Sequence, residues 1–108
     1  MTVNELIEKT NLKAVALPDG NREISGVYIG DLLSWVMGRA QADQAWITIM
    51  SNSNIVAVAT LADTSCIILA EGVVPDAGVA ELAAEKGINL LSSESCAYRT
   101  ALELAKHL

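Results

Sequence analysis

Short apolar runs along this chain are separated by segments with the spacing of amphipathic helices. Runs rich in β-branched residues predict strands, whereas apolar residues three and four apart predict helices. The pattern predicts about five strands, at residues 13–17, 23–29, 45–50, 65–70 and 88–91. It predicts helices after Thr2 and over residues 32–37, 75–87 and 95–108, the last with Ala97, Ala101, Leu104 and Leu108 on one face.

Residues 54–63, with the sequence NIVAVATLAD, fit two structures. Their β-branched content favours a strand. Their position between two stronger predicted strands favours a crossover helix instead. The pattern alone leaves both open.

Local signals predict where several helices begin and end. Thr2 and Glu5 have the spacing of a capping box. Asp31 is a good N-cap for the helix at 32–37, and Gly38 is a good stop for it. Pro75 suits the first turn of the helix that follows it.

The alternation of strands and helices predicts an α/β fold. We expect three layers, α/β/α, around a mostly parallel central sheet of about five strands. The 108 residues suffice for one domain, which we expect to span 1–108. The chain is 52% hydrophobic yet contains no Phe, and this composition suits close packing of helices on a sheet.

Charge and composition exclude several classes of protein. The net charge is −6 and the seven basic residues are scattered, so we expect no binding to nucleic acid. The longest nearly apolar run, 55–62, is too short to span a membrane. The first ten residues do not resemble a signal peptide, so we expect a cytoplasmic protein. Cys66, Cys96 and His107 lack metal or redox spacing, so we expect reduced thiols, no metal and no cofactor.

The segment 21–33, NREISGVYIGDLL, carries two glycines four residues apart in a predicted strand that leads directly into a helix. One interpretation is structural: Gly26 and Gly30 bracket residues 27–29 and permit a bulge or bend before the helix. The other is functional, since a missing side chain at Gly26 lets a ligand or a second subunit approach the backbone. In that case Arg22 would anchor an anion and the Ser25 hydroxyl would form a hydrogen bond with it.

The same segment resembles a known family. In the DRTGG domain family, the pattern D-R-x-x-T-G-G precedes a helix that often begins S-D-L-L. Residues 21–27 of this chain are NREISGV, followed by GDLL at 30–33, so Arg22 and Gly26 match while Asn21, Ser25 and Val27 differ. The similarity covers nearly the whole chain, including the WITI, NIVAVA and GINLLS stretches.

This resemblance implies a fold like the N-terminal domain of bacterial HPr kinase/phosphatase and the first domain of certain Mur ligases. It implies a regulatory or ligand-binding module without a catalytic centre. Members of the family occur in nucleotide-regulated pyrophosphatases, on phosphotransacetylases and as small stand-alone proteins.

Polar residues also follow the predicted strands. The carboxyl ends of parallel strands form the usual ligand-binding edge of an α/β sheet, and Ser or Asn before a helix favours an anion such as phosphate. Ser and Asn are also ordinary caps and turn residues, so a structural role is the alternative. The residues at this predicted edge are Ser51, Asn52, Ser53, Asn54, Glu71, Gly72, Ser92, Ser93 and Glu94.

The sequence predicts no enzyme. It contains neither GxxxxGK[ST] nor GxGxxG, so a phosphate loop and a dinucleotide fingerprint are both missing. A catalytic triad would need His107, next to the last residue. Asp63, Glu71 and Asp76 flank a predicted strand, and surface charge explains them. No catalytic residues are therefore assigned.

Two functions remain open. In the first, the domain senses a nucleotide or another phosphorylated small molecule and thereby shifts its association with a protein partner in metabolic regulation. In the second, it is a dimerisation or interaction module without a ligand, and we expect a homodimer. A third, more distant function is an enzyme whose site another chain completes. Tyr28, Trp35, Met37 and Trp46 are expected to form an apolar patch, in the core or at a dimer contact.

Overall fold

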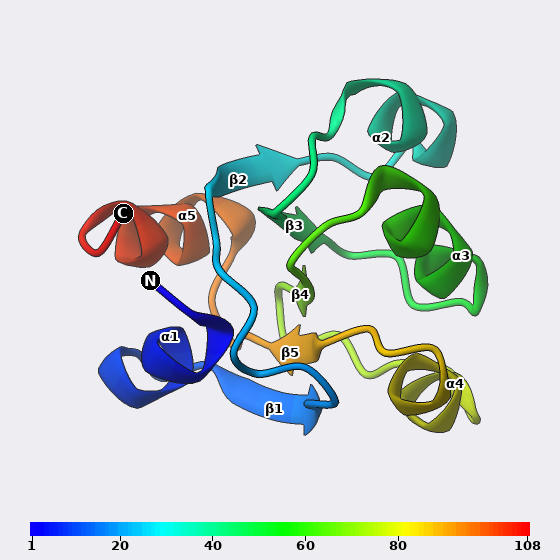
Figure 1. Ribbon diagram of the computed structural model, residues 1–108, viewed down its shortest axis with the longest axis horizontal. Coiled ribbons are helices and arrows are strands. Elements are labelled where there is room, and N and C mark those ends of the chain that lie inside the picture. The colour runs from blue at the N-terminus through cyan, green and yellow to red at the C-terminus, as the bar shows by residue number, and fades with distance from the viewer.

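The computed structural model describes residues 1–108 as an α/β fold with five helices and five strands (Figure 1). The helices are α1 Val3–Lys9, α2 Leu33–Arg39, α3 Asn54–Ala62, α4 Val79–Glu85 and α5 Ala97–Ala105. The strands are β1 Lys13–Ala16, β2 Gly26–Ile29, β3 Gln44–Thr48, β4 Cys66–Leu69 and β5 Leu90–Ser92. The predicted fold class is confirmed.

The strands form one sheet in the order β1-β5-β4-β3-β2. The pairs β2–β3, β3–β4 and β4–β5 are parallel, and only β1 pairs antiparallel, with β5. Strands that follow one another from β2 to β5 are therefore neighbours, each pair joined by one helix. β1 and β2 are the two edges of the sheet.

Helices cover both faces of the sheet. On one face, α2, α3 and α4 pack on a core that includes Trp46, Ile67 and Leu90. On the other face, α1 and α5 pack on a core that includes Ile47 and Ile68 (Figure 1). Successive strand residues point to opposite faces, so a strand buried on both sides is a continuous apolar run. β4 is fully buried for this reason, as its sequence predicts.

The structure decides one open assignment and confirms one local prediction. The segment 54–63 that fitted either structure contains helix α3, which connects β3 to β4 and buries Ile55 and Ala59. The capping box is present, because the Thr2 hydroxyl accepts from the Glu5 amide and the Glu5 carboxylate accepts from the Thr2 amide.

Several predicted element ends are wrong. Asp31 does not cap α2: the N-cap is Leu32, without a side-chain bond. The helix also continues past Gly38 to Arg39. Pro75 lies four residues before α4 rather than in its first turn. In these places tertiary contacts and loop geometry outweigh the local signal.

Two further boundaries differ from the prediction. β2 begins at Gly26, because Glu23 forms only an isolated bridge with Thr2. α5 spans Ala97–Ala105, so Leu108 lies outside it and is about half exposed. None of the helices has the length and apolar content needed to cross a membrane.

Candidate functional site

Arg22 lies before β2, at the amino ends of the parallel strands, where two aspartates bind it. Its Nε and Nη2 donate to Asp43 Oδ1 at 3.2 and 3.0 Å. Its Nη2 also donates to the carbonyl and the carboxylate of Asp63, at 2.6 and 2.8 Å. Asp43 directly precedes β3, and Asp63 lies between α3 and β4. Arg22 therefore links the segments that lead into three neighbouring strands.

The charge of Arg22 is already matched within the chain. Partial burial lowers the pKa of its guanidinium, but the hydrogen bonds to Asp63 and Asp43 outweigh burial and raise the pKa above its ordinary value. An incoming anion would meet two carboxylates beside the guanidinium. This arrangement favours the structural interpretation of Arg22, and its role as an anion anchor stays a prediction.

Ser25 and Gly26 lie beside Arg22 at the same edge of the sheet. The Ser25 hydroxyl donates to the Ala42 carbonyl at 3.2 Å. The predicted bulge at Gly26 is wrong, because β2 pairs with β3 in unbroken register from Gly26 opposite Gln44 onward. A Cβ on Gly26 would lie 3.7 Å from the Gln44 side chain, an ordinary contact. No fold requirement for a glycine is visible at this position.

Gly30, in contrast, is required by a close approach. A Cβ there would lie 2.9 Å from the Tyr28 ring, which packs against the core. The Gly30 carbonyl also accepts a hydrogen bond from the indole of Trp46 at 2.8 Å. The absence of a side chain at Gly30 therefore leaves room for the Tyr28 ring, while its main-chain carbonyl binds Trp46.

The second predicted set of site residues lies at the opposite, carboxyl ends of the strands. Several polar side chains of this set form hydrogen bonds within or between the loops. The Ser51 hydroxyl donates to Asp76 at 2.9 Å, and Asn52 accepts from the Asn54 amide at 2.9 Å. Asp31 acts in the same way, since its carboxylate accepts from the Thr48 hydroxyl at 2.8 Å. The structure thus separates the two predicted sets, and five of their polar side chains, those of Arg22, Ser25, Ser51, Asn52 and Ser93, have partners within the chain.

The loops after β4 and β5 are also joined. The amides of Glu71 and Gly72 donate to the carbonyls of Ser95 and Ser93, both at 2.8 Å. The Ser93 hydroxyl lies 2.7 Å from that of Thr100, and both residues are buried. These backbone donors are occupied, so the link between the loops is not itself an anion site.

A cavity of about 640 Å³ opens beside these loops. It lies between the α1–β1 connection, the end of β5 and the polar side of α5, and we call it the β5–α5 cavity. Only two of its twelve lining residues are hydrophobic. Of the predicted site residues, Ser93 and Glu94 line it. Its volume is in the range of small-molecule sites.

Cationic residues gather in the lining of this cavity. Lys13, Arg99 and Lys106 are three of the seven basic residues in the chain, and two acidic residues, Glu94 and Glu103, line it with them. Lys106 pairs with Glu103 at 3.0 Å, whereas Lys13 and Arg99 form no ion pair. The cavity lining is therefore positive in a chain whose net charge is −6.

Sequence reasoning missed these cations because it considered only the segment 21–33 and the loops after the strands. One signal was available: Arg99 lies in α5 and Lys106, seven residues later, is its C-cap, a spacing of two helical turns that places both on one side. The proximity of α5 to residues 10–13 depends on the fold, and no local pattern predicts it.

Ser53 and Asn54 lie at a different place, a second cavity of about 550 Å³ between α3 and α4. Its lining includes Leu61, Leu82 and Lys86. It is more apolar than the β5–α5 cavity and contains a single cation. It therefore suits a charged ligand less well.

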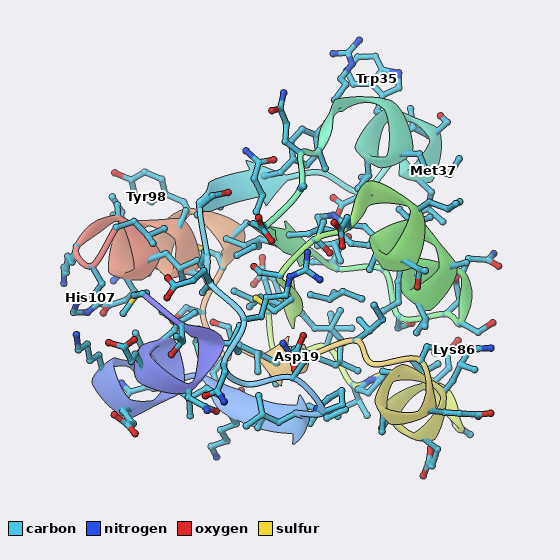
Figure 2. All side chains as sticks on the ribbon, in the orientation of Figure 1. Asp19, Trp35, Met37, Lys86, Tyr98 and His107 are labelled. Atoms are coloured by element: carbon cyan, nitrogen blue, oxygen red, sulfur yellow. The ribbon has the colours of Figure 1, made fainter.

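The groups considered for catalysis do not gather. Asp63 lies at the amino edge with Arg22, whereas Asp76 contacts Ser51 near the carboxyl edge. His107 lies beyond the end of α5 (Figure 2). No three His, Cys, Asp or Glu side chains lie together as metal ligands would.

The predicted aromatic patch is divided by the structure. Trp46 is fully buried and Tyr28 packs against the same core. Trp35 and Met37 are instead about half exposed on α2 (Figure 2). The Arg39 guanidinium lies 3.7 Å from the centre of the Trp35 ring.

The fold defines an α/β domain with a ligand-sized, cationic cavity and two polar strand edges. The DRTGG domain model matches residues 5–107. The chain therefore belongs to the DRTGG domain family, as the motif at residues 21–27 indicates.

A solved structure is similar over 99% of this chain, with a TM-score of 0.75 and 13% sequence identity. It contains the CBS and DRTGG domains of the regulatory region of a Clostridium perfringens pyrophosphatase, complexed with its activator diadenosine tetraphosphate. The match covers 47% of that chain, so the present chain spans about half its length. No curated protein matches the sequence.

Proposed function

We propose that this chain is a non-catalytic regulatory domain that binds a nucleotide or another phosphorylated small molecule in the β5–α5 cavity. The observation that carries the proposal is the gathering of Lys13, Arg99 and Lys106 around a polar cavity in an acidic chain. The related regulatory region from Clostridium perfringens, solved with a nucleotide activator, supports the same ligand class.

Arg99 is the residue best suited to hold a phosphate. Its guanidinium is not engaged by any carboxylate, in contrast to that of Arg22. A planar guanidinium donates two parallel hydrogen bonds to phosphate oxygens, which a carboxylate-bound arginine cannot do freely. The Ser95 hydroxyl, which also lines the cavity, adds a neutral donor.

We propose that binding in this cavity alters the association of the domain with a protein partner in metabolic regulation, in the cytoplasm. The cavity borders the loop of residues 93–95, which is bonded to the loop after β4. A ligand that holds residues 93–95 would therefore also hold Glu71 and Gly72.

The test is a titration of the protein with diadenosine tetraphosphate, ATP, AMP and inorganic phosphate, followed by thermal unfolding and calorimetry. We expect at least one of the three nucleotides to raise Tm saturably, since a ligand that binds only the folded state stabilises it. Arg99→Gln should lower the affinity for that ligand about tenfold or more, which corresponds to a loss of about 1.4 kcal/mol of binding free energy.

Two control variants separate the sites. Lys86→Gln removes the cation of the α3–α4 cavity and should leave the affinity unchanged. Arg22→Gln tests the motif, and should lower stability without changing affinity in the folded protein. If Lys86→Gln or Arg22→Gln abolished ligand binding while Arg99→Gln retained it, the result would contradict the proposed site. A screen in which no phosphorylated compound raises Tm would contradict the function.

The alternative is an association module without a ligand. The half-exposed Trp35 and Met37 on α2 favour it, because large apolar side chains are enriched at protein interfaces. Self-association in the absence of any ligand response would support this second function.

A further inference from the structure

The two edges of the sheet differ in how they are protected. Natural sheets protect exposed edges with charged residues, prolines, bulges or covering segments. β1 begins with Lys13, its register with β5 is irregular between Ala14 and Ala16, and Pro18 follows it. The β1 edge therefore carries three features that oppose pairing with another strand.

β2 carries none of these features. Its four residues, GVYI, include no charge and no proline, and its register with β3 is regular. β2 is the last strand of the sheet on its side, so one row of its backbone donors and acceptors has no strand partner within the chain. Such an edge is a template for another strand.

Large apolar side chains surround this edge. Ile29, at the end of β2, is 50% exposed, and Trp35 on α2 is 52% exposed. Leu32 and Ile49, in the loops after β2 and β3, are 60% and 47% exposed. Figure 2 shows Trp35 at the outer end of the molecule, on the helix next to β2 in Figure 1. We call these four residues together with strand β2 the β2 edge surface.

We propose that the β2 edge surface binds a second copy of this chain, with the two β2 strands antiparallel across a twofold axis so that the two sheets become continuous. A twofold arrangement is self-complementary, because each strand offers the other the same row of donors and acceptors. The inference extends the association function proposed above and does not depend on a ligand.

Charge complementarity supports a second copy as the occupant. α2 leads from the carboxyl end of β2 back to the amino end of β3, so Asp31 and Arg39 lie at opposite ends of α2. Both are exposed. Antiparallel pairing brings the carboxyl end of one β2 to the amino end of the other. The carboxylates at that amino end are already paired, Glu23 with the N-terminal amine and Asp43 and Asp63 with Arg22, whereas Arg39 has no ion pair. Asp31 of each copy then lies on the side of the unpaired Arg39 of the other copy, and the attraction occurs twice.

The mass of the protein in solution tests this interface. Sedimentation equilibrium and light scattering should give two copies at high concentration and a shift toward one copy on dilution. Ile29→Lys places a charge on the paired edge and should raise the dissociation constant at least about tenfold. Arg39→Gln should weaken the dimer less, and its effect should fall as salt is raised.

A matched control uses an apolar residue elsewhere. Leu61 on α3 is 73% exposed, so Leu61→Lys makes the same change away from the edge and should leave the dimer intact. Circular dichroism of both variants checks that they fold. The fluorescence of Trp35 gives a second signal. Because Trp46 is fully buried, quenching by acrylamide reports mainly on Trp35. Formation of the dimer should reduce this quenching.

A protein that stays monomeric at the highest working concentration would overturn the proposal, as would open-ended association beyond two copies. A dimer that Leu61→Lys disrupts and Ile29→Lys does not would assign the contact to another surface. The ligand titration with Arg99→Gln is measured separately, so the β5–α5 cavity and the β2 edge surface can fail independently.

Discussion

The guanidinium of Arg22 binds both the carboxylate and the main-chain carbonyl of Asp63, at 2.8 and 2.6 Å. Asp63 ends α3 in the left-handed conformation, with φ of 59°, immediately before the segment that becomes β4. The arginine of the family motif therefore fixes the turn between a helix and the central strand of the sheet. This contact explains the residue without a ligand.

We expect Arg22→Ala to lower the free energy of unfolding by about 1–2 kcal/mol, since hydrogen bonds between charged groups are lost from a partly buried side chain. Asp63→Asn keeps the size of the side chain and the tolerance for left-handed backbone, and should cost less. In the double variant the loss should be smaller than the sum of the two, because both changes remove one contact. Urea unfolding measures all three.

Arg99→Ala is the matched control for this cycle, because Arg99 forms no ion pair. It should change stability by about 0.5 kcal/mol or less. Additive effects of Arg22→Ala and Asp63→Asn would show that the two residues act independently.

The two glycines of the segment 21–33, Gly26 and Gly30, should respond differently to a methyl group. Gly30→Ala should lower the free energy of unfolding by about 1–2 kcal/mol, because the added Cβ would lie 2.9 Å from the Tyr28 ring. Gly26→Ala has room for its Cβ and should be neutral or raise stability by up to about 1 kcal/mol. Thermal and urea unfolding check both values. Loss of ligand affinity in a stable Gly26→Ala protein would instead show that a ligand approaches this backbone.

Gly38→Ala should stabilise the protein by about 0.5–1 kcal/mol. Gly38 lies inside α2 with open space around it, and alanine favours a helix more than glycine does. Gly78 is the control, because it also has open space but its φ is 86°. Gly78→Ala should therefore destabilise, and equal effects of the two variants would contradict the argument.

The two cysteines should differ in reactivity. Cys66 is fully buried in β4, and burial raises the pKa of its thiol from 9.0 to about 12, although the Ser65 hydrogen bond and Arg22 oppose this. Cys96 is partly exposed. At neutral pH a thiol reagent should modify Cys96 in the folded protein and Cys66 only after unfolding. Equal rates for both thiols would contradict the buried position of Cys66.

The raised pKa of Cys66 also predicts a dependence of stability on pH. The unfolded thiol loses its proton near pH 9, whereas the folded thiol keeps it up to about pH 12. The contribution of Cys66 is therefore fully present below pH 9 and is lost as the pH rises between 9 and about 12, by up to about 1.4 kcal/mol per pH unit. Urea unfolding of Cys66→Ala over the same range should lack this slope.

The polar residues after the strands show where prediction from sequence stopped. Ser51 and Asn52 were correctly placed at the carboxyl edge, because the ends of parallel strands follow from the order of elements. Their partners were not predictable: Ser51 bonds to Asp76, 25 residues away, through a loop whose path the packing of α4 decides. Asp31 illustrates the same limit, since its carboxylate bonds to Thr48 rather than to the helix beside it.

The order of strands and helices, the parallel sheet and the two buried faces were determined by the sequence alone, because strand and helix periodicities are properties of the local backbone. The tertiary structure decided which charges meet. Arg22 finds Asp43 and Asp63, 21 and 41 residues away, only because parallel pairing brings the amino ends of β2, β3 and β4 together. In the same way, the cationic cavity exists only because α5 packs beside the α1–β1 connection, and no local pattern encodes that contact.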